Sequence, residues 1–348
     1  MKLSRSLVFV SLLSLPLFAV DPVKITVRDS ENGWPVPMVE LRTTHHVSFF
    51  SDNAGVVAID LPELMGGDTW FTVESDGYER KADGFGNRGI RISLEPGSEQ
   101  EITVNRTIIA KRLGRLTGGG IFGESQKLGE RLDWRESGTF GSDSVQCSVY
   151  KGKRFWTWGD TNLPKYPLGL FHMPAATTAV NPITSFEPPL AIAFDYFRGK
   201  EDHVRNVANV APNDPGPTWI SGYVSLKDRK GAEHLVGLYS KIKPPMTAYR
   251  SGLCVWNDET GEFESTRVLW ERSKAEEDPP DLLPKGHPIF WTDQNKKDWL
   301  LFGDPLPTIR MAPTFEAWQD PGTWEALQQN RTLKSQEGES IKVHSGSM

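Results

Sequence analysis

One aromatic segment of this 348-residue chain occurs twice, 144 residues apart (297 − 153). The first copy, residues 153–164, reads KRFWTWGDTNLP, and the second, residues 297–307, reads KDWLLFGDPLP. Each copy is a turn, an aromatic strand and a Gly-Asp at the strand end, and residues 233–240 form a weaker third copy. Such repeats predict a β-propeller of four-stranded blades. Because a blade takes ~40–50 residues, the spacing predicts about three blades between the two copies.

The composition agrees with an all-β fold. The chain has 32 Gly, 25 Pro and 12 Trp, and short β-rich runs between turn residues replace long helical stripes. Trp156, Trp158 and Trp299 lie at strand spacing, where aromatic side chains usually fill the space between blades. A jelly roll or a second sandwich is the structural alternative to the propeller.

The first residues predict export. Lys2 and Arg5 precede an apolar run from Leu7 to Phe18, which is too short to span a bilayer and fits a signal peptide over residues 1–20. No later stretch is apolar enough for a transmembrane helix. We therefore expect a secreted, periplasmic or cell-surface protein with no membrane span after cleavage.

Residues 21–111 predict a small β-sandwich. Six short strand-like runs occur there: Val23–Val27, Val39–Leu41, Val56–Ile59, Trp70–Glu74, Ile90–Leu94 and Glu101–Ile109. The turn Ser51–Gly55 precedes an alternating strand, as a hairpin requires. The segments Gly33–Pro37, Ser51–Ile59 and Ser75–Tyr78 together resemble the pattern of carboxypeptidase-regulatory-like (transthyretin-like) sandwiches. The resemblance implies a spacer or adhesion platform without catalysis. Residues 112–348 would then form the propeller.

The start of the second region resembles a family of enzymes. Residues 143–146 (DSVQ) and 155–161 (FWTWGDT) look like the opening blade of five-bladed propeller glycoside hydrolases. The nearest are domain-of-unknown-function family 4185, which includes endo-D-arabinanases, and more distantly glycoside hydrolase family 43. The resemblance covers Thr139 to Asn162 and implies Asp143 and Asp160 as catalytic carboxylates at the propeller centre. Those families use a further acid from a later blade, which no motif here matches.

Strand register supports this pair independently. Lys151-Gly152 can close a tight hairpin, so Tyr150 would pair with Lys153 and paired residue numbers would sum to 303. Asp143 then lies opposite Asp160 on the same face. Like charges there destabilise a sheet, which favours shared chemistry or a bound cation and predicts a raised pKa for one carboxyl. The same arithmetic places His287 opposite Asp304 in the second copy.

Other readings remain open for these residues. Asp160 can cap the turn that follows it, as Asp often does. Trp219, in the loop-like Gly216–Trp219, is a candidate for stacking on a sugar ring. His203 and Arg205, and likewise Tyr249 and Arg250, precede strand-like runs whose ends would line a propeller mouth. These five residues form the candidate substrate-binding set, with a fold-stabilising role as the alternative.

We therefore expect a carbohydrate-active protein that hydrolyses a poly- or oligosaccharide with a carboxylate pair. A non-catalytic carbohydrate-binding propeller is the alternative, and a lyase would need a base such as His203 beside Arg205. The net charge of −6 and the absence of a basic cluster exclude a nucleic-acid footprint. No metal-ligand spacing and no cofactor fingerprint occur, and Cys147 and Cys254 form no CxxC, so a disulfide and free thiols both remain open.

The last residues lead to one further expectation. Residues 341–348 read like the opening of a new strand and lack a closing Trp-Gly-Asp type of strand. Since five-bladed relatives close their ring with a terminal strand, we expect three or four blades and a propeller truncated at its C-terminus.

Overall fold

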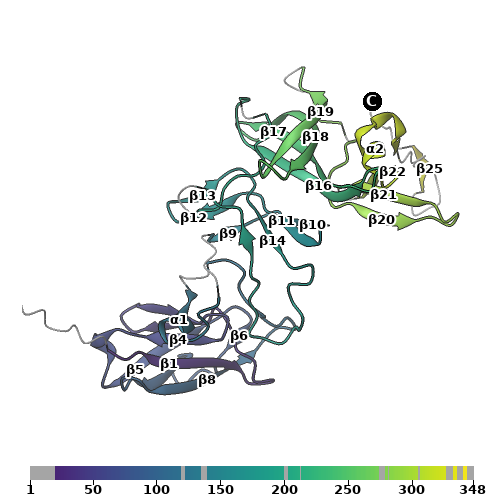
Figure 1. Cartoon of the computed structure of the whole chain (residues 1–348). Coiled ribbons are helices and arrows are strands. Elements are labelled where there is room, and N and C mark those ends of the chain that lie inside the picture. The colour runs from purple at the N-terminus through teal and green to yellow at the C-terminus, as the bar shows by residue number, and fades with distance from the viewer. Residues whose placement is uncertain are drawn as a thin grey trace, which may run out of the picture. The chain divides into compact units, whose positions relative to one another are not determined.

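The computed structural model describes residues 20–118, 122–134, 139–199, 203–211, 213–273, 279–280, 282–304, 306–326, 332–334 and 340–342. The predicted all-β class is confirmed, because the described chain consists mainly of antiparallel sheets with two short α-helices and no closed barrel (Figure 1). Within this part of the chain, no helix has the length and apolarity to span a membrane. The predicted signal peptide falls almost wholly on residues outside the described ones.

The chain forms two compact units. The first comprises the residues up to Arg115, a segment ending at Asp133, and Ser185–Ala191, and the second comprises the rest. The sequence-based boundary between residues 111 and 112 stays a prediction.

The first unit contains two four-stranded sheets. Their strand orders are β4-β1-β8-β6 and β3-β2-β5-β7, and only the β1–β8 pair is parallel. The strands are β1 Val23–Asp29, β2 Glu40–Thr43, β3 Ser48–Phe50, β4 Val56–Ile59, β5 Asp68–Glu74, β6 Tyr78–Glu79, β7 Gly89–Ser93 and β8 Glu99–Arg106, and a 3-10 turn covers Pro62–Leu64.

Alternation of side chains gives this unit its core. Successive residues of β1 are alternately buried and half-buried, as a strand with one covered face requires. Ile25 of one sheet and Leu41 and Phe71 of the other are fully buried in one apolar cluster. Burial of such side chains contributes roughly 1.5–3 kcal/mol each.

The turn expected at Ser51–Gly55 is confirmed. The buried carboxylate of Asp52 accepts hydrogen bonds from the backbone N–H groups of Ala54 (2.8 Å), Val56 (3.1 Å) and Ser125 (2.7 Å). Gly55 has φ +71°, and a Cβ there would lie 2.5 Å from the Val27 carbonyl oxygen. Only glycine fits this position without displacing the backbone.

A short helix covers the outer edge of β4. The buried side chain of Glu124, in α1 (Glu124–Lys127), accepts a hydrogen bond from the Ala58 N–H through Oε2 at 3.0 Å. β4 is an edge strand, whose outward N–H groups would otherwise be free to pair with another chain. Glu124 therefore protects this edge.

The second unit contains three four-stranded antiparallel sheets (Figure 1). Their orders are β10-β11-β14-β15, β16-β17-β18-β19 and β20-β21-β22-β23. Their strands are β10 Gln146–Tyr150, β11 Lys153–Thr157, β14 Ala175–Thr178, β15 Asp195–Tyr196, β16 Thr218–Lys227, β17 Glu233–Lys243, β18 Thr247–Asn257, β19 Glu262–Glu271, β20 Ile289–Thr292, β21 Asp298–Gly303, β22 Pro307–Met311 and β23 Glu325–Ala326. The remaining elements are β9 Gly141–Ser142, β12 Thr161–Leu163 and β13 Tyr166–Leu170 in a three-stranded sheet, α2 Phe315–Gln319, a 3-10 turn at Pro321–Thr323, and the pair β24 Thr332–Lys334 and β25 Ser340–Lys342.

The three sequence repeats occupy equivalent strands. They fall on β11, β17 and β21, each of which is second in its sheet. The expectation of three blades between the outer copies was wrong, because 144 residues span only two sheet-to-sheet steps. The hairpin β12–β13 and the long connection to β16 take up the other residues. The propeller, and its truncation at the C-terminus, stay predictions, and residues 343–348 lie outside the described part.

Candidate functional site

The hairpin β10–β11 has the predicted register. Tyr150 pairs with Lys153 and Gln146 with Thr157, so the paired numbers sum to 303. Lys151 and Gly152 close the turn with φ values of +45° and +74°, the two positive angles that a two-residue hairpin turn requires. The same register reappears beyond Asp143, where Ser142 pairs with Thr161.

The backbone therefore holds Asp143 beside Asp160. The Asp143 N–H donates to the Asp160 carbonyl at 3.2 Å, and the Gly159 N–H donates to the Asp143 carbonyl at 2.9 Å. A Cβ at Gly159 would lie 2.2 Å from Asp143 Oδ1. The glycine thus leaves the space that the Asp143 carboxylate occupies.

The electrostatics of the pair match the expectation of one raised pKa. Burial raises the pKa of Asp160, and the charge of Asp143 adds to the increase. Asp160 Oδ1 is buried and, among the described residues, has no hydrogen-bond partner. A proton on the Asp160 carboxyl would relieve both the repulsion and the cost of desolvating this oxygen. A carboxyl with a raised pKa beside a second carboxyl is the arrangement that a carboxyl acid catalyst needs.

Aromatic rings lie on β11 and on the segment that joins it to Asp160. Trp156 and Trp158 are stacked, with centroids 6.5 Å apart and an interplanar angle of 11°. Phe194 meets both rings edge-on, and Tyr196 lies 5.6 Å from Trp158. Both tryptophans are half-buried. They pack against a small apolar cluster that includes Phe194 and Tyr196, and part of their aromatic surface is left exposed. That they fill the space between blades stays a prediction.

The second Gly-Asp segment differs. Ile289 pairs with Leu301, so paired numbers in the β20–β21 hairpin sum to 590 and not to the expected 591. The prediction that His287 lies opposite Asp304 is wrong, because the turn has three residues (294–296) and not two. Lys296, the last of the three, has φ +62°. The extra residue shifts the register by one. Asp304 lies beside Gly286, where a Cβ on the glycine would be 3.4 Å from Asp304 Cβ.

Three of the proposed substrate-binding residues gather at one end of the sheet β16–β19. Trp219 lies in β16 and not in the expected loop, because its backbone pairs with Ser240, and its Nε1 donates to the Phe171 carbonyl at 3.1 Å. The Tyr249 hydroxyl donates to the Pro215 carbonyl at 2.7 Å. Arg250 forms ion pairs with Asp214 and with Glu271. Their polar groups are thus engaged within the fold.

Lys241, which the sequence reasoning missed, lies between these residues. It pairs with Thr218 on one side and Arg250 on the other, and only 2% of it is exposed. Its Nζ donates to the Gly216 carbonyl (3.0 Å) and to Thr218 Oγ1 (3.2 Å), and burial lowers its pKa. Burial, together with the charge of Lys241, also lowers the pKa of His172. A lone lysine in a strand pattern gives no signal of such burial.

His203 and Arg205 lie elsewhere. Arg205 donates to the Gly261 carbonyl at 2.8 Å and pairs with Glu262 at 3.3 Å, so it fastens the β18–β19 turn. His203 is half-buried and its carbonyl accepts a bond from the Gly199 N–H at 2.8 Å. The guanidinium that a lyase would need is therefore already bound.

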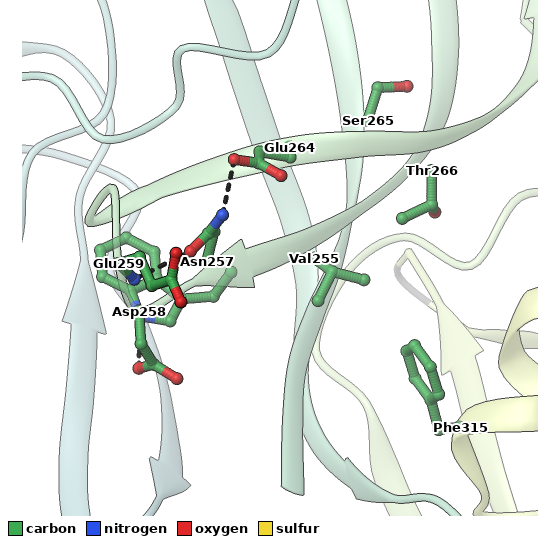
Figure 2. Close-up of a pocket in the computed structure, with 9 residues that line it drawn as sticks. Val255, Asn257, Asp258, Glu259, Glu264, Ser265, Thr266 and Phe315 are labelled. Carbon is green, nitrogen blue, oxygen red and sulfur yellow. Dashed lines mark hydrogen bonds between the residues drawn. The ribbon is translucent and has the colours of Figure 1, made fainter.

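An acidic groove lies at the β18–β19 turn (Figure 2). It measures about 590 Å³, and Asp258 and Glu259 line one end while Phe315 faces the other. Burial opposes the charge of Asp258, but hydrogen bonds from Lys151 and Tyr150 outweigh it and lower the pKa of this carboxyl. Lys151 is at the tip of the β10–β11 hairpin, whereas Asp143 lies beyond the opposite, open end of this hairpin. The acids of the groove therefore cannot complete the pair.

Neither cysteine forms a disulfide. Cys147 is exposed on β10, whereas Cys254 is buried and its thiol donates to the Gly237 carbonyl at 3.2 Å. Burial raises the pKa of Cys254 well above its ordinary value. Within the described ranges, no group of three or more metal-ligating side chains is assembled.

Comparison with known proteins adds no family. No family model matches the chain, and no curated protein matches it. Among solved structures, the Bacillus anthracis TIE protein is similar with a TM-score of 0.20 and 10% sequence identity. The match covers 73% of this chain and 49% of that protein, so the chain spans about half the length of that relative. A similarity of this size carries no argument about fold or function.

Proposed function

We propose that this chain is an exported carbohydrate-active protein that hydrolyses glycosidic bonds of a poly- or oligosaccharide. This proposal rests on the placement of Asp143 beside Asp160, together with the raised pKa of Asp160 and its buried oxygen that has no hydrogen-bond partner among the described residues. Glycoside hydrolysis uses two carboxyls, one protonated and one charged, on either side of the scissile bond. Asp160 would be the acid, and Asp143 the nucleophile or base.

We also propose the finer architecture. The second unit would be propeller-like, which is supported by three four-stranded antiparallel sheets, in two of which all sequential strands are neighbours. First strands of two sheets also meet, since the Ser225 N–H donates to Ser148 Oγ at 3.1 Å. The first unit would be a transthyretin-like sandwich, supported by two sheets that share one core.

A non-catalytic carbohydrate-binding protein is the second candidate. One observation favours it: neither of the two cavities described for this molecule includes Asp143 or Asp160. Binding without turnover would then use the aromatic surface alone.

The test is release of reducing ends from a panel of plant, bacterial and fungal polysaccharides. Asp160→Asn and Asp143→Asn should each lower the rate at least about 100-fold, the usual contribution of an acid–base group. Asp304→Asn is the matched control, because it alters the equivalent Gly-Asp without a second aspartate beside it, and it should keep full activity. Saccharide binding without any product would favour the second candidate, and equal rates for all variants would refute the assignment.

A further inference from the structure

A second cavity lies between the first strands of two sheets. It measures about 480 Å³, within the range of small-ligand pockets, and its lining includes Ser225 and Lys227 of β16, Trp291 of β20 and Asp298 of β21. Neither member of the carboxylate pair lines it.

Exposed aromatic side chains mark this cavity. All four residues of β20 are exposed, and the exposed fractions of Phe290 and Trp291 are 61% and 45%. Trp299, the cross-strand partner of Trp291, is by contrast buried, with Lys297 Nζ 3.8 Å and Arg310 Cζ 4.1 Å from its ring centroid. Trp299 therefore forms a fixed wall, while the ring of Trp291 remains open to a ligand.

The polar lining has complementary hydrogen-bonding groups. Thr292 Oγ1 donates to Asp298 Oδ1 at 2.6 Å, which orients the carboxylate and leaves Oδ2 with no hydrogen bond to any described residue. Lys227 of β16 supplies ammonium donors, and Ser225 supplies a hydroxyl. A carboxylate acceptor and an ammonium donor beside an aromatic face fit the adjacent hydroxyls and the C–H face of a sugar ring. An apolar peptide would leave these charged groups unpaired.

We propose that this cavity binds one ring of a neutral saccharide, stacked on Trp291 and hydrogen-bonded by Asp298 and Lys227. The proposal rests on the carbohydrate-directed function above only for the class of ligand. The cavity would then be a binding subsite separate from the catalytic pair. It would hold one part of a polysaccharide while another part of the same polysaccharide reacts at the pair.

The test is affinity electrophoresis of the full chain in gels containing neutral polysaccharides (arabinan, xylan, mannan and β-glucan). Trp291→Ala should weaken retardation by at least 10-fold in apparent Kd, and Asp298→Asn, which preserves the strand, should also weaken it. Phe85→Ala is the matched control, since Phe85 is 95% exposed, lies in the first unit and should change nothing. Thermal unfolding of each variant verifies that the fold is retained.

Three results would overturn the inference. The first is no retardation of the wild type in any gel, and the second is retardation that Trp291→Ala and Asp298→Asn leave unchanged. The third is a wild type that is dimeric in solution and becomes monomeric with Trp291→Ala, which would make β20 a contact between copies. Two variants separate this proposal from the proposed hydrolysis. If Asp160→Asn loses hydrolysis but is still retarded in the gels, both proposals are supported. If Trp291→Ala shows normal hydrolysis and normal retardation, only the subsite is refuted.

Discussion

The replacement Asp160→Asn should make the protein more stable at pH 7. Opposed like charges in a sheet cost about 0.2–1 kcal/mol, and the amide can donate to the Asp143 carboxylate in place of repelling it. For a unit of this size, such a gain raises Tm by up to about 4 °C. A structural aspartate would show the opposite sign, since its removal destabilises the fold.

The pH dependence provides the sharper assay. The pKa of Asp160 is raised in the folded state, so the folded protein binds the proton more tightly than the unfolded chain. Wild-type stability from this group is therefore greatest below pH 3.8, the unfolded value, and falls as the pH rises through the folded pKa. The stability difference between Asp160→Asn and wild type should vanish near pH 3 and reach its maximum near pH 7.

Urea unfolding followed by tryptophan fluorescence measures this difference at each pH. Asp304→Asn is the control and should stay within about 0.5 kcal/mol of wild type throughout. The reasoning fails if Asp160→Asn is less stable than wild type at pH 7, or if its gain is the same at pH 3.

Three further predictions concern other parts of the chain. Gly159→Ala should lower the free energy of unfolding by about 1–3 kcal/mol and also lower hydrolytic activity, because its Cβ would lie 2.2 Å from Asp143 Oδ1. Gly67→Ala is the control in the same urea titration, since a Cβ there would have no atom within 4 Å. Glu124→Ala should lower the free energy of unfolding by about 1–3 kcal/mol and speed hydrogen exchange at the Ala58 N–H. Glu130→Ala is the control: it removes a more exposed ion pair with Lys24 and should lower the free energy of unfolding by less than about 1 kcal/mol. Equal losses for the two variants would argue against edge protection by Glu124. A thiol reagent should modify one cysteine of the native protein and two after unfolding, and Cys147→Ser should abolish the native reaction; rapid modification of native Cys147→Ser would show that Cys254 is accessible.

Much of the first unit could be predicted from local signals. Turn residues such as Asp52 and Gly55 delimit β4, and all six strand-like runs correspond to strands. β3 and β6 were missed because strands of two or three residues carry no periodicity of their own. The contact between Glu124 and Ala58 joins residues 66 apart in sequence, and nothing in either segment indicates it.

For the first hairpin of the second unit, the sequence predicted the strand pairing but not the environment of the polar residues. The turn Lys151–Gly152 determines the register of β10 and β11, so the position of Asp143 opposite Asp160 followed from counting. The bonds that occupy Arg205, Tyr249 and Arg250 depend on carbonyls and carboxylates supplied by distant loops. A polar residue at a strand start therefore looks the same in sequence whether it is free for a ligand or already bound.

The two Gly-Asp segments show why a repeated motif need not carry a repeated function. Both follow the second strand of a four-stranded sheet, so the motif itself belongs to the fold. The turn before the strand has two residues in one hairpin and three in the other, and side chains alternate with a period of two. Asp304 lies beside Gly286, whereas Asp160 lies beside a second aspartate. Asp143 and Asp160 therefore place two like charges opposite each other, which destabilises a sheet, and the proposed catalytic use of the pair rests on this contrast with Asp304.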